Sequence, residues 1–193
     1  PDSSEGILKL SGTNVTLNQV ITSANYTNLT LEPTTNYNGS ATFTWQGYDG
    51  EYGSDNNFTI SVTAVNDAPT FTLGSNQTVN EDAGSQSISN FATGIDEGGG
   101  TDENSQTLTF TTTNNNNSLF SAQPSISSNG ILTYTAATNA FGSATVTVVL
   151  KDNGGGENGG ADTVTKTFTI TVNAVNDTPT QTTIAPQNLS EDF

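Results

Sequence analysis

The chain has 193 residues with three Lys, no Arg and no His against 19 Asp and Glu, which gives a formal net charge of −16 at pH 7. Such a surface repels nucleic acid and anionic membranes and favours cations as partners. The sequence has no Cys for disulfides, no apolar run of membrane-spanning length, and no nucleophile–base pair, phosphate loop or transition-metal set, so we expect neither membrane insertion in this segment nor an enzyme.

Alternation of apolar and small polar residues predicts an all-β protein. A low apolar content with a high net charge is typical of disordered chains, but Phe58–Val62 (FTISV) and Phe168–Val172 (FTITV) alternate with a period of two. This period, with Thr or Ser on the solvent-facing side, is typical of half-buried strands. We find no convincing helical stretch.

The segment 36–49 (NYNGSATFTWQGYD) contains the alternating run Phe43-Thr44-Trp45. Trp45 alternates with Phe43 there, which predicts a core position for its ring. The alternative is that Trp45 forms a sugar-stacking platform with Tyr48 and Tyr52.

A seven-residue phrase occurs twice, as AVNDAPT at residues 64–70 and as AVNDTPT at residues 174–180. The two copies lie 110 positions apart, which is the length of one sandwich-type domain. Pro69 and Pro179 fix their own φ and hold the preceding residue extended. We therefore expect short Pro-containing linkers, without a flexible Gly hinge, between tandem domains.

Between the two linkers the pattern predicts seven strands separated by turns rich in Gly, Asn and Asp. Seven strands in about 110 residues are typical of an immunoglobulin-like or cadherin-like β-sandwich. The predicted strands cover residues 71–79, 86–91, 106–113, 118–126, 131–135, 143–151 and 163–174.

The internal matches divide the chain into three pieces. Residues 36–49 match residues 139–152, and residues 186–192 after the second linker match residues 76–82 after the first. We interpret residues 1–69 as an incomplete repeat that lacks its first strands, residues 70–179 as a complete repeat, and residues 180–193 as the first strand of a third. An incomplete repeat exposes a sheet edge, and the tail could add to that edge in another copy.

Several motifs carry a family resemblance: the VNDxP linker, the acidic pair in TVNEDAG and the ending TFTITVNAVNDTP. Together they resemble the cadherin-like tandem repeats of large bacterial surface proteins, which include calcium-dependent adhesins exported by type I secretion. The resemblance implies an extracellular location, either at the cell surface or secreted. It also implies calcium as the bound ion and neighbouring repeats of the same chain as partners.

Calcium takes six to eight oxygen ligands, and the chain clusters oxygen donors at the linkers and at acidic turns. Ala64 and Ala174 stand where related linkers have Asp, so we expect one or two ions at most at each junction. The resemblance implies that Glu81 and Asp152 join Asn176 and Asp177, and that Asp49 joins Asn66 and Asp67. The alternative for each acidic residue is a solvated turn. The candidate ligands are Asp49, Asn66, Asp67, Glu81, Asp82, Asp96, Asp102, Asp152, Asn176 and Asp177.

Two functions follow. The first is a non-enzymatic repeat of a bacterial adhesin, a calcium-stiffened spacer that supports adhesion. The alternative is a structural subunit of an extracellular filament or sheath, assembled with other copies through repeat–repeat or strand-addition contacts. A glycan-binding module is a third possibility.

Overall fold

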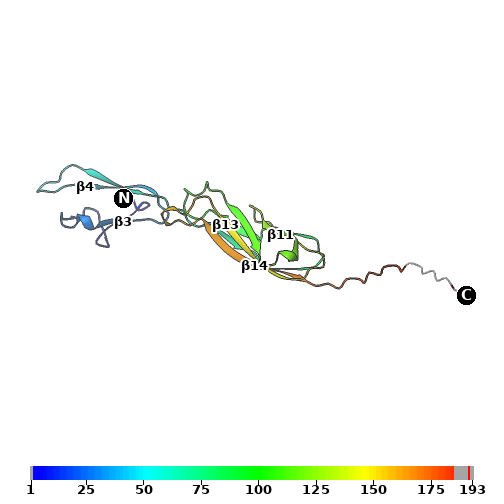
Figure 1. The fold of residues 1–193 in the computed structure, drawn as a ribbon. Helices are drawn as coiled ribbons and strands as arrows, with labels where there is room; N and C mark the ends of the chain where they lie inside the picture. Colours follow the sequence, from blue (N-terminus) through cyan, green and yellow to red (C-terminus); the bar gives the residue numbers. More distant parts are fainter. Residues whose placement is uncertain (1, 185–190, 192–193) are drawn as a thin grey trace.

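The computed structural model describes residues 2–184 and 191. The molecule is elongated, with a smaller N-terminal unit and a larger second unit placed end to end (Figure 1). Strands dominate both units, and the helical elements among the described residues are three single 3₁₀ turns. The all-β prediction is therefore confirmed. Within the described residues, no helix has the length and apolar character needed to cross a membrane.

The N-terminal unit contains two separate small sheets. One has the order β2-β1-β3 and the other is the antiparallel pair β4–β5. The linker begins directly after the last of these strands. The strands are β1 (Gly6–Leu10), β2 (Thr13–Asn14), β3 (Leu29–Pro33), β4 (Gly39–Trp45) and β5 (Asn56–Val62).

The β4–β5 pair has one apolar and one polar face. Phe43 pairs with Phe58, and their ring centroids lie 5.3 Å apart, while Thr42 pairs with Thr59 on the opposite face. Trp45 follows on the apolar face but is 53% exposed. The prediction that Trp45 belongs to a core is therefore wrong. Trp45 pairs with Asn56 at the end of the hairpin, and in residues 2–69 no described strand forms hydrogen bonds with the outer edge of β4 or β5.

The second unit contains nine strands in three hydrogen-bonded sets. The four-stranded sheet has the order β10-β13-β14-β7, the three-stranded sheet has the order β11-β12-β8, and β6 pairs with β9. The strands are β6 (Thr70–Leu73), β7 (Gln77–Asn80), β8 (Ser85–Ile88), β9 (Ala92–Asp96), β10 (Thr109–Asn114), β11 (Phe120–Ile126), β12 (Leu132–Ala136), β13 (Gly142–Lys151) and β14 (Thr163–Asn173).

One hydrophobic core joins the sheets of the second unit. Val146 and Val148 of β13, Ile170 of β14 and Leu132 of β12 are all fully buried in it. Each such side chain stabilises the fold by about 1.5–3 kcal/mol through apolar burial. The alternation seen in the sequence places these residues inward and their Thr neighbours outward.

The predicted strand 71–79 is in fact two strands, which pair with different partners. β6 pairs with β9, whereas β7 runs parallel to β14. The break falls at Gly74, where a Cβ would lie 2.9 Å from the Phe91 ring, and at Asn76, whose Oδ1 accepts a hydrogen bond from the Thr169 N–H. β9 has no counterpart among the predicted strands, because Thr93 and Gly94 interrupt its apolar alternation.

Two stretches outside the strands matter for the repeat architecture. The linker residues 63–69 lie between β5 and β6, and Pro69 is buried. After β14, residues 174–184 form no strand and extend away from the second unit (Figure 1). The strand predicted at 180–193 is thus absent from residues 180–184, and residues 185–190, 192 and 193 lie outside the described part of the chain.

Candidate site at the junction of the two units

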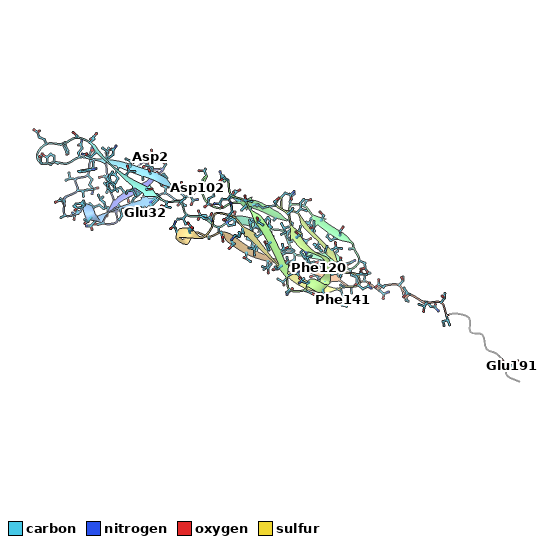
Figure 2. The ribbon with its side chains drawn as sticks, turned by 45° about the horizontal axis from the view of Figure 1, so that its top comes forward. Asp2, Glu32, Asp102, Phe120, Phe141 and Glu191 are labelled. Atoms are coloured by element: carbon cyan, nitrogen blue, oxygen red, sulfur yellow. The ribbon has the colours of Figure 1, made fainter. Side chains whose placement is uncertain are left out.

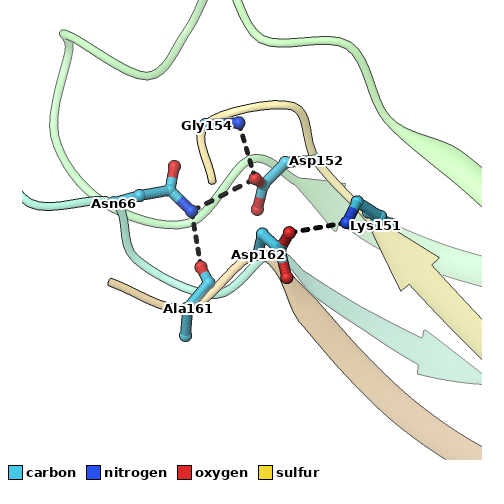
Figure 3. Close-up of polar contacts among 6 residues, drawn as sticks. All are labelled: Asn66, Lys151, Asp152, Gly154, Ala161 and Asp162. Atoms are coloured by element: carbon cyan, nitrogen blue, oxygen red, sulfur yellow. Dashed lines mark hydrogen bonds and ion pairs between the residues drawn. The ribbon is translucent and has the colours of Figure 1, made fainter. Parts of the chain in front are cut away.

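The side chain of Asn66 attaches the linker to the second unit (Figure 3). Its Nδ2 donates hydrogen bonds to Asp152 Oδ1 over 3.1 Å and to the Ala161 carbonyl over 2.5 Å. The Ala161 N–H donates in return to the Asn66 carbonyl over 2.9 Å. The Gly154 N–H also donates to Asp152 Oδ1, over 2.9 Å. The loop between β13 and β14 therefore holds the linker through both side-chain and backbone contacts.

Glycine in that loop allows the close approach. A Cβ on Gly154 would lie 1.7 Å from Asn66 Oδ1, and one on Gly160 would lie 3.0 Å from the Asn66 carbonyl oxygen. Both distances are too short for a side chain to fit without movement of its neighbours. The Gly-rich segment 152–162 is thus a surface on which the linker packs.

Glu103 holds the next linker residue. Its side chain is 3% exposed. Oε1 accepts a hydrogen bond from the Asp67 N–H over 2.8 Å, and Oε2 accepts one from the Gly99 N–H over 2.6 Å. A carboxylate that accepts two backbone N–H groups fixes both segments relative to each other.

Two carboxylates approach each other beside Gly99. The position that a Cβ would take on Gly99 lies 2.6 Å from Asp67 Oδ2 and 2.9 Å from Glu103 Oε2. The two oxygens are therefore no further apart than the sum of these distances, 5.5 Å. Asp67 is exposed, so water screens the repulsion between the two charges. A cation placed between them would offset this repulsion.

An open pocket of about 270 Å³ lies on the boundary between the two units. Asp67, Asp102 and Glu103 line it from the linker and the second unit. Pro33, Thr34, Asn36, Tyr37 and Asn38 line it from the first unit. Figure 2 shows Asp102 where the two units meet. A Cβ on Gly100 would lie 3.2 Å from the carbonyl oxygen of Asn36, so the two units approach each other closely here.

Two buried oxygen atoms near Asn66 have no hydrogen-bond partner. Asp152 is 2% exposed and its Oδ2 is unpaired, as is Gln106 Oε1. Gln106 uses its Nε2 to donate to Asn66 Oδ1 over 2.7 Å. Unpaired buried acceptors cost free energy, so both atoms are placed to accept a hydrogen bond or to coordinate a cation.

An ion pair lies at the base of the same loop. Lys151 Nζ donates to Asp162 Oδ2 over 2.6 Å (Figure 3). This hydrogen bond, together with the negative charge of Asp162, raises the pKa of Lys151. The pair holds the Lys151 ammonium group against Asp162 at the end of β13.

The structure separates Asp49 from the linker. Asp49 follows β4 at the tip of the hairpin, whereas Val62, the residue of β5 that leads into the linker, pairs with Gly39 at the other end. The six residue steps of β4 between these ends span about 20 Å. The expected grouping of Asp49 with Asn66 and Asp67 is therefore wrong. Asp96 lies at the junction end, where it pairs with Thr70 and its Oδ1 accepts from the Gly98 N–H over 3.0 Å.

At the far end of the second unit, Glu81 holds the second linker. Glu81 is 7% exposed, and its Oε1 accepts a hydrogen bond from the Val175 N–H over 2.7 Å. Asp82 Oδ1 lies 3.4 Å from the Asn139 N–H. Asn176 and Asp177 are exposed, and the Asn176 side chain donates a hydrogen bond to the Asp177 carbonyl over 3.1 Å.

The expected grouping of Asp152 with Asn176 and Asp177 is wrong. Asp152 follows the end of β13 that pairs with Thr163, whereas Asn176 follows the opposite end of β14. Asp152 therefore lies at the first junction, beside Asn66. Sequence reasoning left Glu103, Gln106 and Asp162 out of the candidate set. The sequence offered one clue to them, which is that they lie close along the chain to Asp102 or within the Gly-rich segment 152–162. Among residues 2–184 and 191, no three acidic side chains converge closely enough to form a preformed metal cage.

Comparison with protein-family models gave no match for this chain, and comparison with curated protein sequences gave none either.

Proposed function

We propose that the chain is a non-enzymatic segment of an extracellular adhesin, at the cell surface or secreted, in which calcium at the repeat junctions stiffens a spacer of cadherin-like β-sandwiches. The observation that carries this proposal is the junction itself. Acidic loops of the second unit enclose Asn66 and Asp67 of the linker, and the buried Asp152 presents an unpaired oxygen there.

The donor set at the junction fits calcium. Carboxylate, amide and carbonyl oxygens are the ligands that this ion prefers, and Asp67, Asp102, Glu103 and Asp152 supply carboxylates around the linker. Asp152 Oδ2 and Gln106 Oε1 are buried acceptors without donors. Calcium would supply positive charge that offsets the repulsion among these carboxylates and would tie the linker to the loops of the second unit.

The same proposal assigns a role to the second linker. Asn176 and Asp177 repeat Asn66 and Asp67, and Glu81 holds the backbone just before them. Glu81 and Asp82 would contribute to this second junction from the preceding repeat. A following repeat would supply the counterparts of Glu103 and Asp152.

Small-angle scattering of the chain in calcium and in chelator tests the spacer function. We expect calcium to narrow the distribution of interatomic distances without changing the strand content seen by circular dichroism. Asp67→Ala should abolish this response, whereas Asp49→Ala, at the hairpin tip, should preserve it. A distribution that calcium leaves unchanged, or an equal response in both variants, would contradict the proposal.

A further inference from the structure

Asparagine followed directly by glycine occurs four times in the chain. In such a step the backbone nitrogen of the glycine can attack the side-chain carbonyl of the asparagine, because glycine has no Cβ to obstruct the approach. Whether a step reacts therefore depends on how firmly the fold holds its two residues. The four steps are Asn38–Gly39, Asn129–Gly130, Asn153–Gly154 and Asn158–Gly159.

The fold holds the first two steps in place. Gly39 is the first residue of β4 and is already paired with β5. The Gly130 N–H donates a hydrogen bond to the Ser127 carbonyl over 2.9 Å, and Asn129 Oδ1 accepts one from the Ser127 hydroxyl. A Cβ on Gly130 would overlap the Ala92 carbonyl oxygen, so the surroundings leave no room for the asparagine side chain to swing onto the backbone.

The Gly-rich segment between β13 and β14 contains the other two steps, and the first of them is also held. The Gly154 N–H donates to Asp152 Oδ1 over 2.9 Å, and Asn153 Oδ1 accepts a hydrogen bond from the Thr107 N–H over 2.7 Å. Gly154 lies so close to Asn66 that a Cβ would overlap its Oδ1. Both reacting groups of Asn153–Gly154 are therefore engaged, and their reaction would require these contacts to break.

Asn158–Gly159 is open by comparison. Both residues are exposed, and the Asn158 side chain has no hydrogen-bond partner among the described residues. A Cβ placed on Gly159 would meet no atom within 4 Å. Asn158 has φ 55° and ψ 21°, in the left-handed region that strains a residue with a Cβ. Rotation of its backbone toward ring closure therefore enters open space and relieves this strain.

We propose that the chain modifies itself at Asn158–Gly159. The Gly159 nitrogen forms a bond to Asn158 Cγ, and the bond between Cγ and Nδ2 breaks. Nδ2 leaves as ammonia and takes up the proton that the Gly159 nitrogen loses. The product is a five-membered succinimide ring, in which the Gly159 nitrogen is bonded to both carbonyl carbons of residue 158.

Water then opens the ring at one of two bonds. Hydrolysis between the nitrogen and Cγ leaves aspartate with the normal backbone. Hydrolysis between the nitrogen and the main-chain carbonyl carbon leaves isoaspartate, whose main chain runs through Cβ and Cγ and is one atom longer. Either product has a carboxylate in place of a neutral amide, which adds one negative charge to the −16 of the chain.

The longer main chain of isoaspartate lies next to the contacts that hold the linker. The 3₁₀ turn η3 (Glu157–Gly159) is closed by the Gly160 N–H, which donates to the Glu157 carbonyl over 2.9 Å. The next residue, Ala161, exchanges two hydrogen bonds with Asn66 (Figure 3). An extra atom before Gly160 changes the spacing that these bonds require. Isoaspartate therefore loosens the loop from the linker, an effect that goes beyond the spacer function and does not depend on calcium.

Ageing of the folded 193-residue chain tests the reaction. The chain is kept warm at mildly alkaline pH, where the attacking nitrogen loses its proton more readily, and is then digested after lysine. The fragment 152–166 carries both Asn153 and Asn158, so tandem mass spectrometry compares the two in one peptide. We expect carboxylate in place of amide, with an isoaspartate fraction, at Asn158 and an intact Asn153. In urea both should convert, because the contacts that protect Asn153 are lost.

Three outcomes of this experiment would overturn the proposal. They are an intact Asn158, equal conversion of Asn153 and Asn158 in the folded chain, and an Asn153 that stays intact in urea. Asn158→Gln removes the five-membered ring and should stop the release of ammonia from this fragment, with an unchanged circular dichroism spectrum. Equal release from the Asn158→Gln chain would also overturn the proposal.

Hydrogen exchange at Ala161 tests the effect on the linker. The Ala161 N–H donates to the Asn66 carbonyl and should exchange faster in the isoaspartate form than in the fresh chain. Asn158→Asp is the matched control, because it adds the charge without lengthening the main chain, and its Ala161 N–H should exchange as slowly as in the fresh chain. Equal exchange in the isoaspartate form and the fresh chain, or equally fast exchange with Asn158→Asp, would overturn the assigned effect.

Discussion

Replacing Glu103 by Ala tests how strongly the second unit holds the linker. The substitution removes the carboxylate that accepts the Asp67 N–H and the Gly99 N–H. Hydrogen bonds to charged groups contribute about 1.5–3 kcal/mol each. Two of them give about 3–6 kcal/mol, from which the lost repulsion with the exposed Asp67, about 1 kcal/mol in water, must be subtracted. We expect a net loss of about 2–5 kcal/mol in the free energy of unfolding.

Urea denaturation followed by far-ultraviolet circular dichroism measures this loss. The only Trp, Trp45, lies in the first unit, so its fluorescence reports that unit separately and should show a smaller change. Glu157→Ala is the matched control, because Glu157 is an exposed carboxylate in the neighbouring loop. The reasoning would be refuted if Glu103→Ala unfolded at the same urea concentration as the unsubstituted chain, or if both variants were equally destabilised.

Three further outcomes are expected. Calcium at 100 times its dissociation constant should stabilise the chain by about 2.7 kcal/mol per site. The melting temperature should rise with calcium but not with magnesium, and Asp152→Asn should reduce the rise. Equal melting temperatures in calcium and in chelator would contradict this prediction. Gly154→Ala should lower the stability of the second unit against urea by about 1–3 kcal/mol, because the new Cβ would overlap Asn66 Oδ1. Gly156→Ala should have little effect, because the nearest atom to its Cβ lies 3.5 Å away. Equal effects of the two substitutions would show that the loop does not hold the linker. The pKa of Lys151 is raised, so its ion pair stabilises the fold below the unfolded pKa of about 10.5, and this contribution is lost as the pH rises through the folded value. An NMR titration should show that Asp162→Asn lowers the pKa of Lys151, and an unchanged pKa would contradict the pairing.

The strands of the second unit were largely predictable because its core is built from clear alternation. Val146 and Val148 alternate with Thr on β13, and they are fully buried, as the pattern indicates. Gly74 marked a break that the apolar pattern alone did not reveal, since the chain stays extended on both sides of it. Trp45 was assigned to a core from its own strand, but burial depends on the strands beside it, which local periodicity does not report.

The candidate site was predictable in its chemistry and not in its grouping. The linker pair Asn66 and Asp67 lies among acidic loops, as expected from the repeated phrase. Which carboxylates surround it depends on which end of each strand faces the junction. Sheet topology decides which strand ends face the junction. It places Asp152 beside Asn66, and it places Asp49 at the hairpin tip, about 20 Å along β4 from the end that leads into the linker. Glu103 was missed because burial of a carboxylate against backbone N–H groups leaves no pattern in the sequence.

The parallel pairing of β7 with β14 has a mechanical consequence. β7 lies near the start of the second unit and β14 at its end, and they pair from Ile170 with Gln77 to Asn173 with Asn80. Tension along the rod pulls the two strands in opposite directions along their axes, so their hydrogen bonds are sheared together instead of being unzipped one at a time. We therefore expect a single-molecule pulling experiment on this unit to show one high-force rupture rather than a series of small steps.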